Sequence, residues 1–489
     1  MADALDKKKN VVTFLLQNNV LVTSDLLQRM NDPRFLDTLY DMSASPQPGQ
    51  DIHQMIGSVP RTEAPGVVIV RDYDVAGRKV TVDDFVAYFK ARFRALARIL
   101  SERQELAAVT SISRLSPNGE REKVALIGFV ADKQETKNGN LIVVLEDLTG
   151  SVKLIFPKSR EQMFKKAKDL VLDEVIGVLG QNAGGAIFVS DIIHPDVPLT
   201  HELKKSPTED YLVVLSDPHV GSNNFLPEEF GKCIRWLRGE TGTERQRAMA
   251  RKVRYVVIVG DAVDGVGIYP AQNKELTLPD INEQYKEFER FIKEIPAHIR
   301  VIISPGNHDA VRLAEPQPKI PREYLPVLHD LPNITFVSNP AVVVVGRTDT
   351  FPGFDVLLYH GYSYDYYGDR VDSIRESGKD VSARISLIMR FLLQRRHLAP
   401  SYDSTQFIVD PQRDALVIES APDFFFSGHI HKSSFLNYRG VTIISGSCFQ
   451  ARTKFQEKVG HNPDPCRVPI VNLQTREVSV LNFSSGDAA

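Results

Sequence analysis

The stretch Val301-Ile302-Ile303-Ser304-Pro305-Gly306-Asn307-His308-Asp309 joins an apolar run to a group of polar residues. The branched apolar residues predict a short buried strand, and Pro305 and Gly306 predict that the chain turns where this strand ends. An amide, an imidazole and a carboxylate then follow in succession. Polar residues directly after a buried strand are typical of an α/β sheet, because such sheets build their sites at the carboxyl ends of their strands.

Four more apolar runs in the same half of the chain end in this way. They are Leu212 to Leu215 before Asp217-Pro218-His219, Tyr255 to Val259 before Gly260-Asp261, Val356 to Tyr359 before His360-Gly361, and Phe424 to Phe426 before Gly428-His429-Ile430-His431. Helical segments alternate with these runs. The pattern predicts one α/β domain over residues 201–489, with a single site assembled from several strand ends.

The residues expected at this site are those that bind metal ions, and none is a thiolate. Such a donor set favours Mn²⁺, Fe²⁺ or Zn²⁺, and it is too large for one tetrahedral ion. It suits two ions about 3.5 to 4 Å apart that share one carboxylate. The candidate ligands are Asp217, His219, Asp261, Asn307, His360, His429 and His431.

The spacing of these ligands is physically sensible. Residues i and i+2 of an extended segment face the same side, so the side chains of Asp217 and His219 can reach one ion. Glycines precede three of the ligand positions, which predicts tight turns at Gly260, Gly306 and Gly428.

Residues 76–200 predict a helix followed by a small barrel. Thr81 is a good N-cap before a helix whose apolar residues, from Phe85 to Leu100, recur at helical spacing. Five short strands then follow between Val124 and Val189, with a helical piece at 160–168 between the third and the fourth. This order resembles an OB-like barrel, for which we expect a structural or interface role because its strands offer few exposed aromatic residues.

The first 75 residues read as a small helical module over residues 1–42 and a linker over residues 43–75. Apolar residues such as Val11, Leu15 and Leu26 recur at helical spacing, and Pro, Gly, Ser and Gln accumulate after Ser43. The predicted fold class is therefore a multi-domain chain: a helical module, an OB-like barrel, and an α/β domain.

Composition excludes several classes of protein. The chain has 489 residues, 42% of them hydrophobic, with a net charge of −3, which are ordinary globular values. Its three cysteines cannot make a disulfide framework, so a reducing, cytoplasmic setting fits, and no apolar stretch is long enough to span a bilayer. Local basic stretches exist at 232–254 (8 − 2 = +6) and at 384–397 (four arginines), and solvated helix faces are the better explanation for either one taken alone.

The five strand ends together resemble the calcineurin-like metallophosphoesterase superfamily, whose pattern is Asp-x-His, Gly-Asp, Gly-Asn-His-Asp/Glu, His and Gly-His-x-His in that order. Over its whole length, the chain resembles the small subunits of archaeal D-family DNA polymerases. The segments Gly446 to Phe455 and Val468 to Ile470 also resemble that family. The implied fold of the last domain is a β-sandwich flanked by helices.

The resemblance also implies roles for individual residues. One metal would be held by Asp217, His219, Asp261 and His431, and the second by Asp261, Asn307, His360 and His429. His308 would stabilise or protonate the leaving oxygen, and Asp309 would orient the imidazole of His308. The repair nucleases of the superfamily carry a histidine where this chain has Asp264, so we expect Asp264 to orient a neighbouring histidine or to contact metal-bound water.

Three functions remain open from the sequence. The first is a metal-dependent 3′ to 5′ exonuclease that proofreads for a large polymerase subunit and acts on single-stranded or mismatched 3′ ends of DNA. Its expected metal is Mn²⁺, and Mg²⁺ is also possible. The second is a catalytically silent scaffold subunit of a polymerase, and the third is a phosphomonoesterase such as a protein phosphatase. Tyrosines at 362, 364, 366 and 367 follow a ligand in what reads as a loop, where they could stack on an unpaired nucleotide or simply pack.

Overall fold

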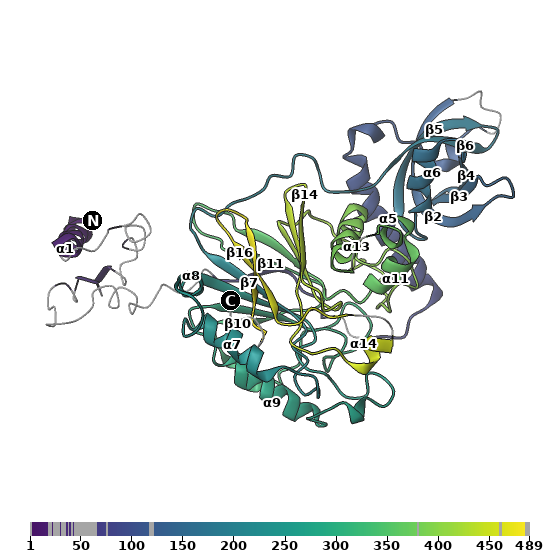
Figure 1. The fold of residues 1–489 in the computed structure, drawn as a ribbon. Helices are drawn as coiled ribbons and strands as arrows, with labels where there is room; N and C mark the ends of the chain where they lie inside the picture. The colour runs from purple at the N-terminus through teal and green to yellow at the C-terminus, as the bar shows by residue number, and fades with distance from the viewer. Residues whose placement is uncertain are drawn as a thin grey trace.

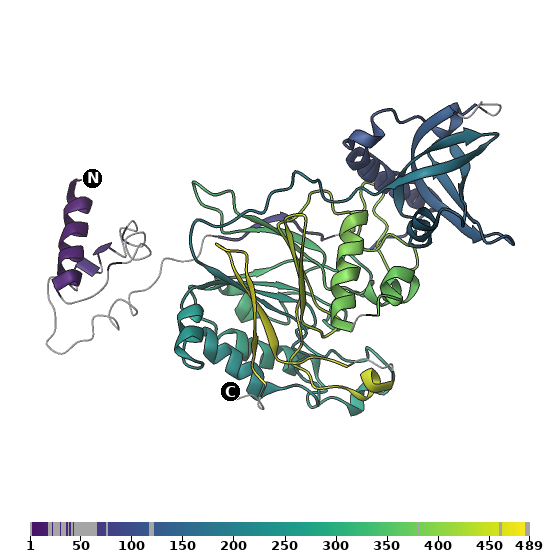
Figure 2. The same cartoon turned by 45° about the horizontal axis from the view of Figure 1, so that its top comes forward.

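The computed structural model describes residues 2–17, 66–74, 77–116, 122–378, 381–458 and 462–484, together with single positions between 22 and 43. The first element is helix α1 (Ala2–Gln17), which lies apart from the sheets in Figures 1 and 2. Val11 and Leu15 of α1 are buried against Met30, Leu36 and Leu39, as helical spacing predicts. Most of the predicted linker over residues 43–75 lies outside the described residues.

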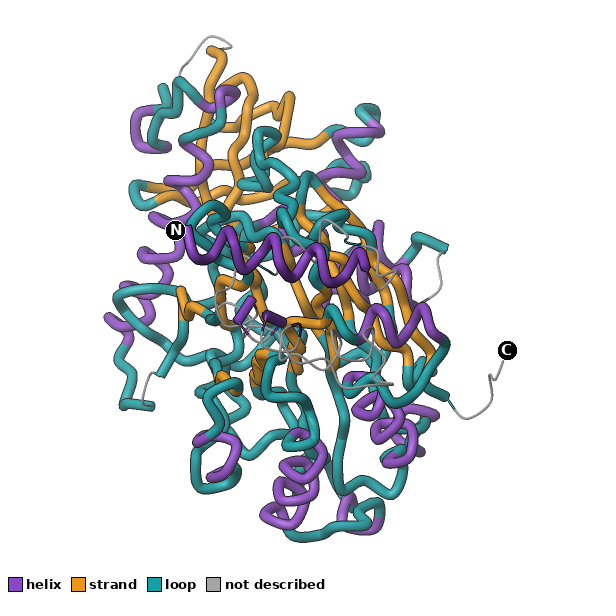
Figure 3. The backbone as a smooth tube through the Cα atoms, turned by 90° about the vertical axis from the view of Figure 1, so that its left-hand side faces the viewer, coloured by secondary structure: helices purple, strands orange, loops and turns teal. Residues whose placement is uncertain are grey.

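The barrel follows helix α5 (Val82–Ser101). Thr81 and Asp84 form a capping box at the start of this helix, which confirms the predicted N-cap. The barrel is closed in the order β2-β3-β4-β6-β5, and its strands stand at the top of Figure 3. Its elements are β2 (Glu122–Glu135), β3 (Leu141–Asp147), β4 (Gly150–Phe156), α6 (Glu161–Lys168), β5 (Val175–Ala183) and β6 (Ala186–Ile193). Helix α6 falls between the third and fourth strands, as predicted.

Two six-stranded sheets make up the rest of the chain. The first has the order β10 (Ile334–Phe336), β9 (Arg300–Ser304), β8 (Val253–Val259), β7 (Tyr211–Leu215), β16 (Arg467–Asn472) and β17 (Val478–Asn482). The second has the order β1 (Val68–Arg71), β11 (Ala341–Val345), β12 (Phe354–Leu358), β13 (Phe424–Ser427), β15 (Val441–Ser445) and β14 (Ser434–Tyr438). Strands β7, β8 and β9 are parallel neighbours, and so are β12 and β13.

The two sheets pack face to face, and helices cover their outer faces. Residues of both sheets, such as Val257 and Phe424, share one buried core. Helices α7 (Pro227–Leu237), α8 (Glu244–Ala250), α9 (Ile281–Ile292) and α10 (Pro326–Asp330) lie with the first sheet, and α11 (Tyr364–Arg370), α12 (Asp372–Arg375) and α13 (Val381–Arg395) with the second; α14 (Lys454–Lys458) precedes β16. Short 3₁₀ turns occur at Gln104–Leu106, Ile112–Arg114 and Gln272–Lys274. In Figure 2, α13 lies between the second sheet and the barrel.

The structure departs from the sequence-based expectation at two places in this fold. Residues 68–71 belong to the range predicted as a linker, yet they form edge strand β1, because the branched run Val67 to Val70 pairs with β11. The predicted tyrosine loop is helix α11, in which Tyr364 and Tyr367, three residues apart, both point into the core. Among the described residues, no helix is long and apolar enough to cross a membrane.

Candidate metal centre

The seven candidate ligands follow five strands whose carboxyl ends meet at one edge of the two sheets. Asp217 and His219 come after β7, Asp261 after β8 and Asn307 after β9 of the first sheet; His360 comes after β12, and His429 and His431 after β13, of the second. Contacts run across the two sheets at this edge: the amide N–H of His429 donates to both oxygens of Asp217, at 3.1 and 3.0 Å.

Most of these residues have an unusual backbone conformation. Positive φ angles, in the left-handed region that favours glycine, occur at Asp217 (51°), His219 (52°), Asp261 (51°), His429 (71°) and His431 (57°). Each such residue costs about 1 to 3 kcal/mol and persists only where the surrounding structure enforces it. Strain at five of seven positions therefore indicates that the strand ends are shaped to aim side chains.

Two of the three glycines predicted to make turns serve a different purpose. Gly260 has a φ of 84°, as a glycine turn predicts, but no positive φ occurs at Gly306 or Gly428. A Cβ atom at Gly306 would lie 2.2 Å from Oδ1 of Asp261, and one at Gly428 would lie 2.5 Å from Oδ2 of Asp217. These two positions lack a side chain because the carboxylates occupy the space.

Asp261 lies between the histidines of the two sheets. Its Oδ2 is 3.2 Å from Nε2 of His360 and 3.7 Å from Nε2 of His219. Its Oδ1 accepts a hydrogen bond from the amide N–H of His308 at 2.8 Å. A carboxylate with imidazole nitrogens on both sides has the position that a bridging ligand needs.

Hydrogen bonds made by Nδ1, the ring nitrogen that faces away from the centre, orient two of the imidazoles. Nδ1 of His360 donates to the carbonyl of Val259 at 2.9 Å, which leaves its Nε2 facing Asp261 and, at 3.1 Å, Oδ1 of Asn307. Nδ1 of His219 lies 3.1 Å from Oδ1 of Asp264, and its Nε2 lies 3.0 Å from Nε2 of His431. A hydrogen bond at Nδ1 fixes the orientation of the ring and leaves Nε2 free to bind a metal ion.

The donor set fits divalent cations. Ligand atoms gather within 4.8 Å of one another in three groups: Asp217 with His219 and His431, His219 with Asp261 and His308, and Asp261 with His360 and His429. The first group contains three of the four residues expected for one metal, and the third group contains three of the four expected for the other. Asp261, which was expected in both, falls in the second and third groups. Carboxylates and imidazoles without a thiolate are suited to Mn²⁺, Fe²⁺ or Zn²⁺.

The electrostatics of the centre agree with this chemistry. Burial alone would raise the pKa of Asp261, but the imidazoles of His360 and His308 hold it well below the usual range. Burial alone would lower the pKa of His360, but Asp261 and Asp217 raise it to about 10. The pKa of Asp217 is also lowered, by His431 and His360, despite its burial. The buried carboxylates of Asp261 and Asp217 therefore remain ionised and attract positive charge into the centre.

Asp264 is buried behind His219 and is held by two glutamines. Besides its contact with Nδ1 of His219, its carboxylate accepts from Nε2 of Gln450 and from Nε2 of Gln272, each at 2.9 Å. This carboxylate thus orients the His219 imidazole, which is one of the two roles expected for it. The sequence analysis gave neither glutamine a role: Gln272 belongs to no motif, and Gln450 belongs only to the segment Gly446 to Phe455 that resembles the family.

The prediction that Asp309 orients the imidazole of His308 is wrong. The Asp309 carboxylate instead accepts from the amide N–H groups of Gly306 and Ala262, at 2.8 and 3.3 Å, and from the hydroxyl of Tyr285 at 3.1 Å. It closes the turn that carries Asn307 and His308, whereas Nδ1 of His308 donates to the carbonyl of Asp264 at 2.7 Å. Burial and the charge of Asp261 raise the pKa of Asp309 to about 7.

Of the four tyrosines predicted near the centre, the structure places Tyr362 beside a candidate ligand. Tyr364 and Tyr367 are fully buried, and the hydroxyl of Tyr364 hydrogen-bonds to Ser427. Tyr362 remains partly exposed, with its ring centroid 5.7 Å from that of the ligand His429. Tyr366 is also partly exposed, but its ring packs against that of Tyr367 at 5.1 Å.

The basic stretches do not form an open cationic surface. Arg395 and Arg396 of the second stretch are buried, and Arg395 pairs with Glu174 at 2.9 Å. In the first stretch most of the basic side chains pair with carboxylates: Arg238 with Glu240 and Glu294, Arg247 and Arg251 with Glu244, Lys252 with Glu209, and Arg254 with Asp210. Paired charges of this kind offer little to a phosphate backbone.

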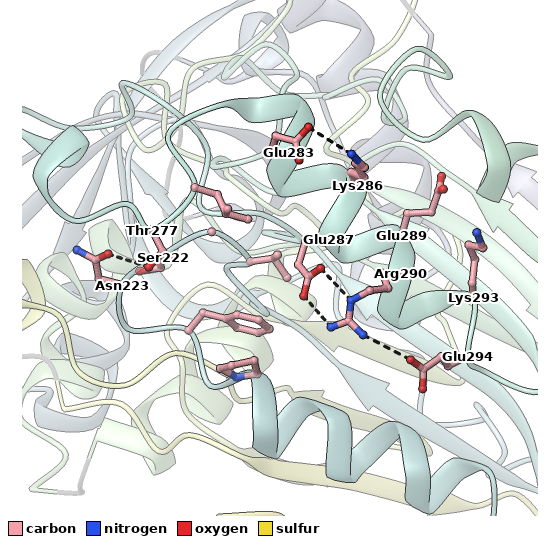
Figure 4. A pocket seen from close by; sticks show the side chains of 15 residues that line it. Ser222, Asn223, Thr277, Glu283, Lys286, Glu287, Glu289, Arg290, Lys293 and Glu294 are labelled. Carbon is pink, nitrogen blue, oxygen red and sulfur yellow. Dashed lines mark hydrogen bonds and ion pairs between the residues drawn. The ribbon is translucent and has the colours of Figure 1, made fainter.

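A cavity of about 820 Å³ lies along α9, and none of the seven candidate ligands lines it (Figure 4). Its charged side chains neutralise one another: Glu283 faces Lys286, and Arg290 contacts both Glu287 and Glu294. Four glutamates against three basic residues line this space, which is unfavourable for a polyanion.

Comparisons with known proteins identify relatives over most of the chain. The family that comprises the B subunits of DNA polymerases alpha and epsilon matches residues 212–436. The DNA polymerase II small subunit of Methanothermobacter thermautotrophicus is 38% identical over 84% of this chain and 82% of its own length. That of Methanocaldococcus jannaschii is 40% identical over 83% of this chain and 67% of its own length. An archaeal phosphodiesterase structure, 15% identical, aligns with 55% of this chain and 98% of its own, with a TM-score of 0.26.

Proposed function

The chain belongs to the family of small subunits of archaeal DNA polymerase II, the family D polymerase, and from that premise we propose that it is a metal-dependent 3′ to 5′ exonuclease. In this proposal the two packed sheets form a metallophosphoesterase domain, and the enzyme removes mispaired nucleotides during replication. The name of its relatives, small subunit, supports a large catalytic subunit as partner, and DNA as substrate.

The observation that carries the proposal is the convergence of seven ligand-type side chains from five strand ends. Asp261 contacts histidines of both sheets, at 3.2 and 3.7 Å, and all seven positions of the superfamily pattern keep a ligand-type residue. A subunit whose only role was assembly would need none of these buried carboxylates and imidazoles. Retaining strained backbone at five of them would be a cost without a benefit.

In the proposed mechanism, two groups of ligands hold the cations and His308 contacts the substrate. Asp217, His219, Asp261 and His431 would hold one cation, and Asp261, Asn307, His360 and His429 a second. A pair of divalent cations, when bound, acidifies water and neutralises charge on a phosphodiester. His308, whose Nδ1 is fixed by the carbonyl of Asp264, would present Nε2 to the scissile phosphate.

The test uses the purified chain, alone and in complex with its large subunit, in buffer containing Mn²⁺. The substrates are 3′-labelled single-stranded DNA and duplex DNA with a mismatched 3′ end. We expect stepwise release of 3′ nucleotides, reduced at least 100-fold in a His308→Ala variant because one charge-stabilising group is lost. A matched His329→Ala variant, which removes a histidine stacked on Phe336 and not located at the centre, should keep wild-type activity.

Two results would contradict the proposal. Hydrolysis of a phosphomonoester alone would indicate a phosphatase. Inactivity with Mn²⁺, Fe²⁺, Zn²⁺ and Mg²⁺, combined with tight association with the large subunit, would indicate a scaffold.

A further inference from the structure

An apolar loop lies at the rim of the metal centre. Residues 265–269 follow Asp264 directly, and Val266 and Ile268 in this loop are 49% and 39% exposed. Tyr269, the last residue of the loop, is partly exposed. Exposed apolar side chains are ordinary when scattered, but here they sit together beside a cluster of charged groups.

The apolar loop is held firmly in place. Nε2 of Gln272 donates to the carbonyl of Asp264 at 2.8 Å, and Oε1 of Gln272 accepts from the amide of Ile268 at 2.8 Å. Gln284 binds both the amide and the carbonyl of Gly265, at 2.9 and 3.1 Å. Both glutamines are buried. The exposed side chains of Val266 and Ile268 are therefore presented by a fixed backbone.

The loop also touches His308, the residue expected beside the scissile phosphate. A Cβ atom at Gly265 would lie 2.3 Å from the carbonyl oxygen of His308. The ring centroids of Tyr269 and His308 are 6.4 Å apart, with an angle of 61° between the rings. The hydroxyl of Tyr269 bonds to Oε2 of Glu275 at 3.1 Å, which fixes the direction of the ring.

We propose that Val266, Ile268 and Tyr269 form a platform against which the terminal base of an unpaired 3′ strand packs. This inference rests on the proposed exonuclease function and adds the determinant that selects frayed ends. The phosphate and sugar of a nucleotide are polar, so the only part that gains by covering apolar side chains is the face of the base. A base attached to a phosphate beside His308 is close enough to reach this loop.

A paired 3′ end would keep its base stacked in the duplex and could not use the platform. Unstacking a paired base costs free energy, whereas a mismatched or single-stranded base is already free. The platform therefore lowers the cost of engaging a mispaired terminus relative to a paired one. This gives proofreading selectivity without hydrogen bonds to particular bases.

The experiment compares two substrates in the complex of the chain with its large subunit. One is DNA with a mismatched 3′ end, and the other is the same DNA with an abasic 3′-terminal nucleotide, which has no base to pack on the platform. In a Val266→Ser/Ile268→Ser variant we expect the ratio of the rate on mismatched DNA to the rate on abasic DNA to fall about tenfold. A Val327→Ser variant, which changes a valine of similar exposure on α10, should keep the wild-type ratio.

A binding measurement tests the platform without any chemistry. DNA carrying 2-aminopurine at its 3′ end is titrated with the complex in the presence of a chelator, and stacking on Tyr269 should quench its fluorescence. Tyr269→Phe should retain the quenching and Tyr269→Ala should lose it. The inference is overturned if the double serine variant keeps the wild-type rate ratio, if the Tyr269→Ala variant keeps the quenching, or if a protein partner covers the loop in the assembled complex. If wild type hydrolyses neither substrate, the proposed function fails, while the fluorescence still reports on the platform.

Discussion

Replacing Gly306 with alanine should displace the carboxylate of Asp261 and thereby disable the centre. The new Cβ atom would lie 2.2 Å from Oδ1, 2.8 Å from Cγ and 2.6 Å from the amide nitrogen of Asp261. Ordinary van der Waals contact begins at 3.4 Å, so Oδ1 would have to move by about 1.2 Å to restore it. Neither the amide nitrogen nor the strand behind it can retreat easily, because β8 is buried between β7 and β9.

A displacement of this size has a predictable consequence. Misplacing a reacting or ligating group by about 1 Å costs roughly 100-fold in rate. We therefore expect Gly306→Ala to lower Mn²⁺-dependent DNA hydrolysis at least 100-fold and to weaken Mn²⁺ binding measured by isothermal titration calorimetry. The backbone at this position does not have a positive φ, so alanine adds no dihedral strain. Its contact with the amide nitrogen of Asp261 should lower the melting temperature, and the rates are therefore compared at a temperature at which wild type and variant are both folded.

Gly77→Ala provides the matched control, since a Cβ atom there would meet nothing within 4 Å. Circular dichroism should show both variants folded. If Gly306→Ala binds Mn²⁺ and hydrolyses DNA within threefold of wild type, the assignment of Asp261 as the shared ligand is refuted.

Three further predictions concern the support of the centre, its cations and the pH dependence of stability. Gln450→Leu removes a hydrogen bond to Asp264 and should weaken Mn²⁺ affinity about 10- to 100-fold in calorimetry. Mn²⁺ at 100 times its dissociation constant should stabilise the chelator-treated chain by about 2.7 kcal/mol in denaturant titrations, and an Asp217→Asn variant should show no such gain. Burial and Arg92 lower the pKa of His397 to about 4, so the unfolded chain binds the extra proton and unfolding free energy should fall by about 3 kcal/mol as pH drops from 6.5 to 4. A His397→Asn variant should lose that part of the pH dependence.

The tautomer of His397 supports the sign of the pH prediction. Its Nδ1 accepts from the amide of Ala399 at 3.0 Å, and its Nε2 donates to Oδ2 of Asp414 at 2.9 Å. Protonation of Nδ1 would break the first of these bonds within a buried site. The neutral form is therefore the one that the fold stabilises.

The convergence of the candidate ligands could be predicted from the sequence because each one comes within a few residues of the end of a strand. The apolar runs before Asp217, Asp261 and His360 identify the strands, and parallel strands bring their carboxyl ends together. The packing of one sheet on the other could be predicted only from the resemblance to a known superfamily. Nothing in the sequence of β12 or β8 predicts that Nδ1 of His360 will donate a hydrogen bond to the carbonyl of Val259.

Groups that act through tertiary contacts could not be predicted from the sequence. Gln450 reaches Asp264 from 186 residues away, and the partners of Asp309 depend on the path of the turn at Gly306. The tyrosines after His360 were ambiguous, because a spacing of three residues fits both a helix face and a loop with alternating exposure. Burial against α13 decides between them, and it depends on residues far along the chain.

Two buried ion pairs fasten the barrel and its preceding helix to the sheets that carry the centre. Nε of Arg92 on α5 lies 2.6 Å from Oδ2 of Asp414, and Nε of Arg395 on α13 lies 2.9 Å from Oε2 of Glu174 beside the barrel. All four side chains are at most 4% exposed. Separating such a pair leaves a buried charge without compensation, which costs about 3 to 5 kcal/mol for each pair broken. Motion of the barrel relative to the centre would break both pairs at once. These two ion pairs therefore hold the barrel in a fixed position relative to the centre. In the proposed exonuclease, selection between paired and frayed 3′ ends would then come from the DNA and the apolar loop, and not from movement of the barrel.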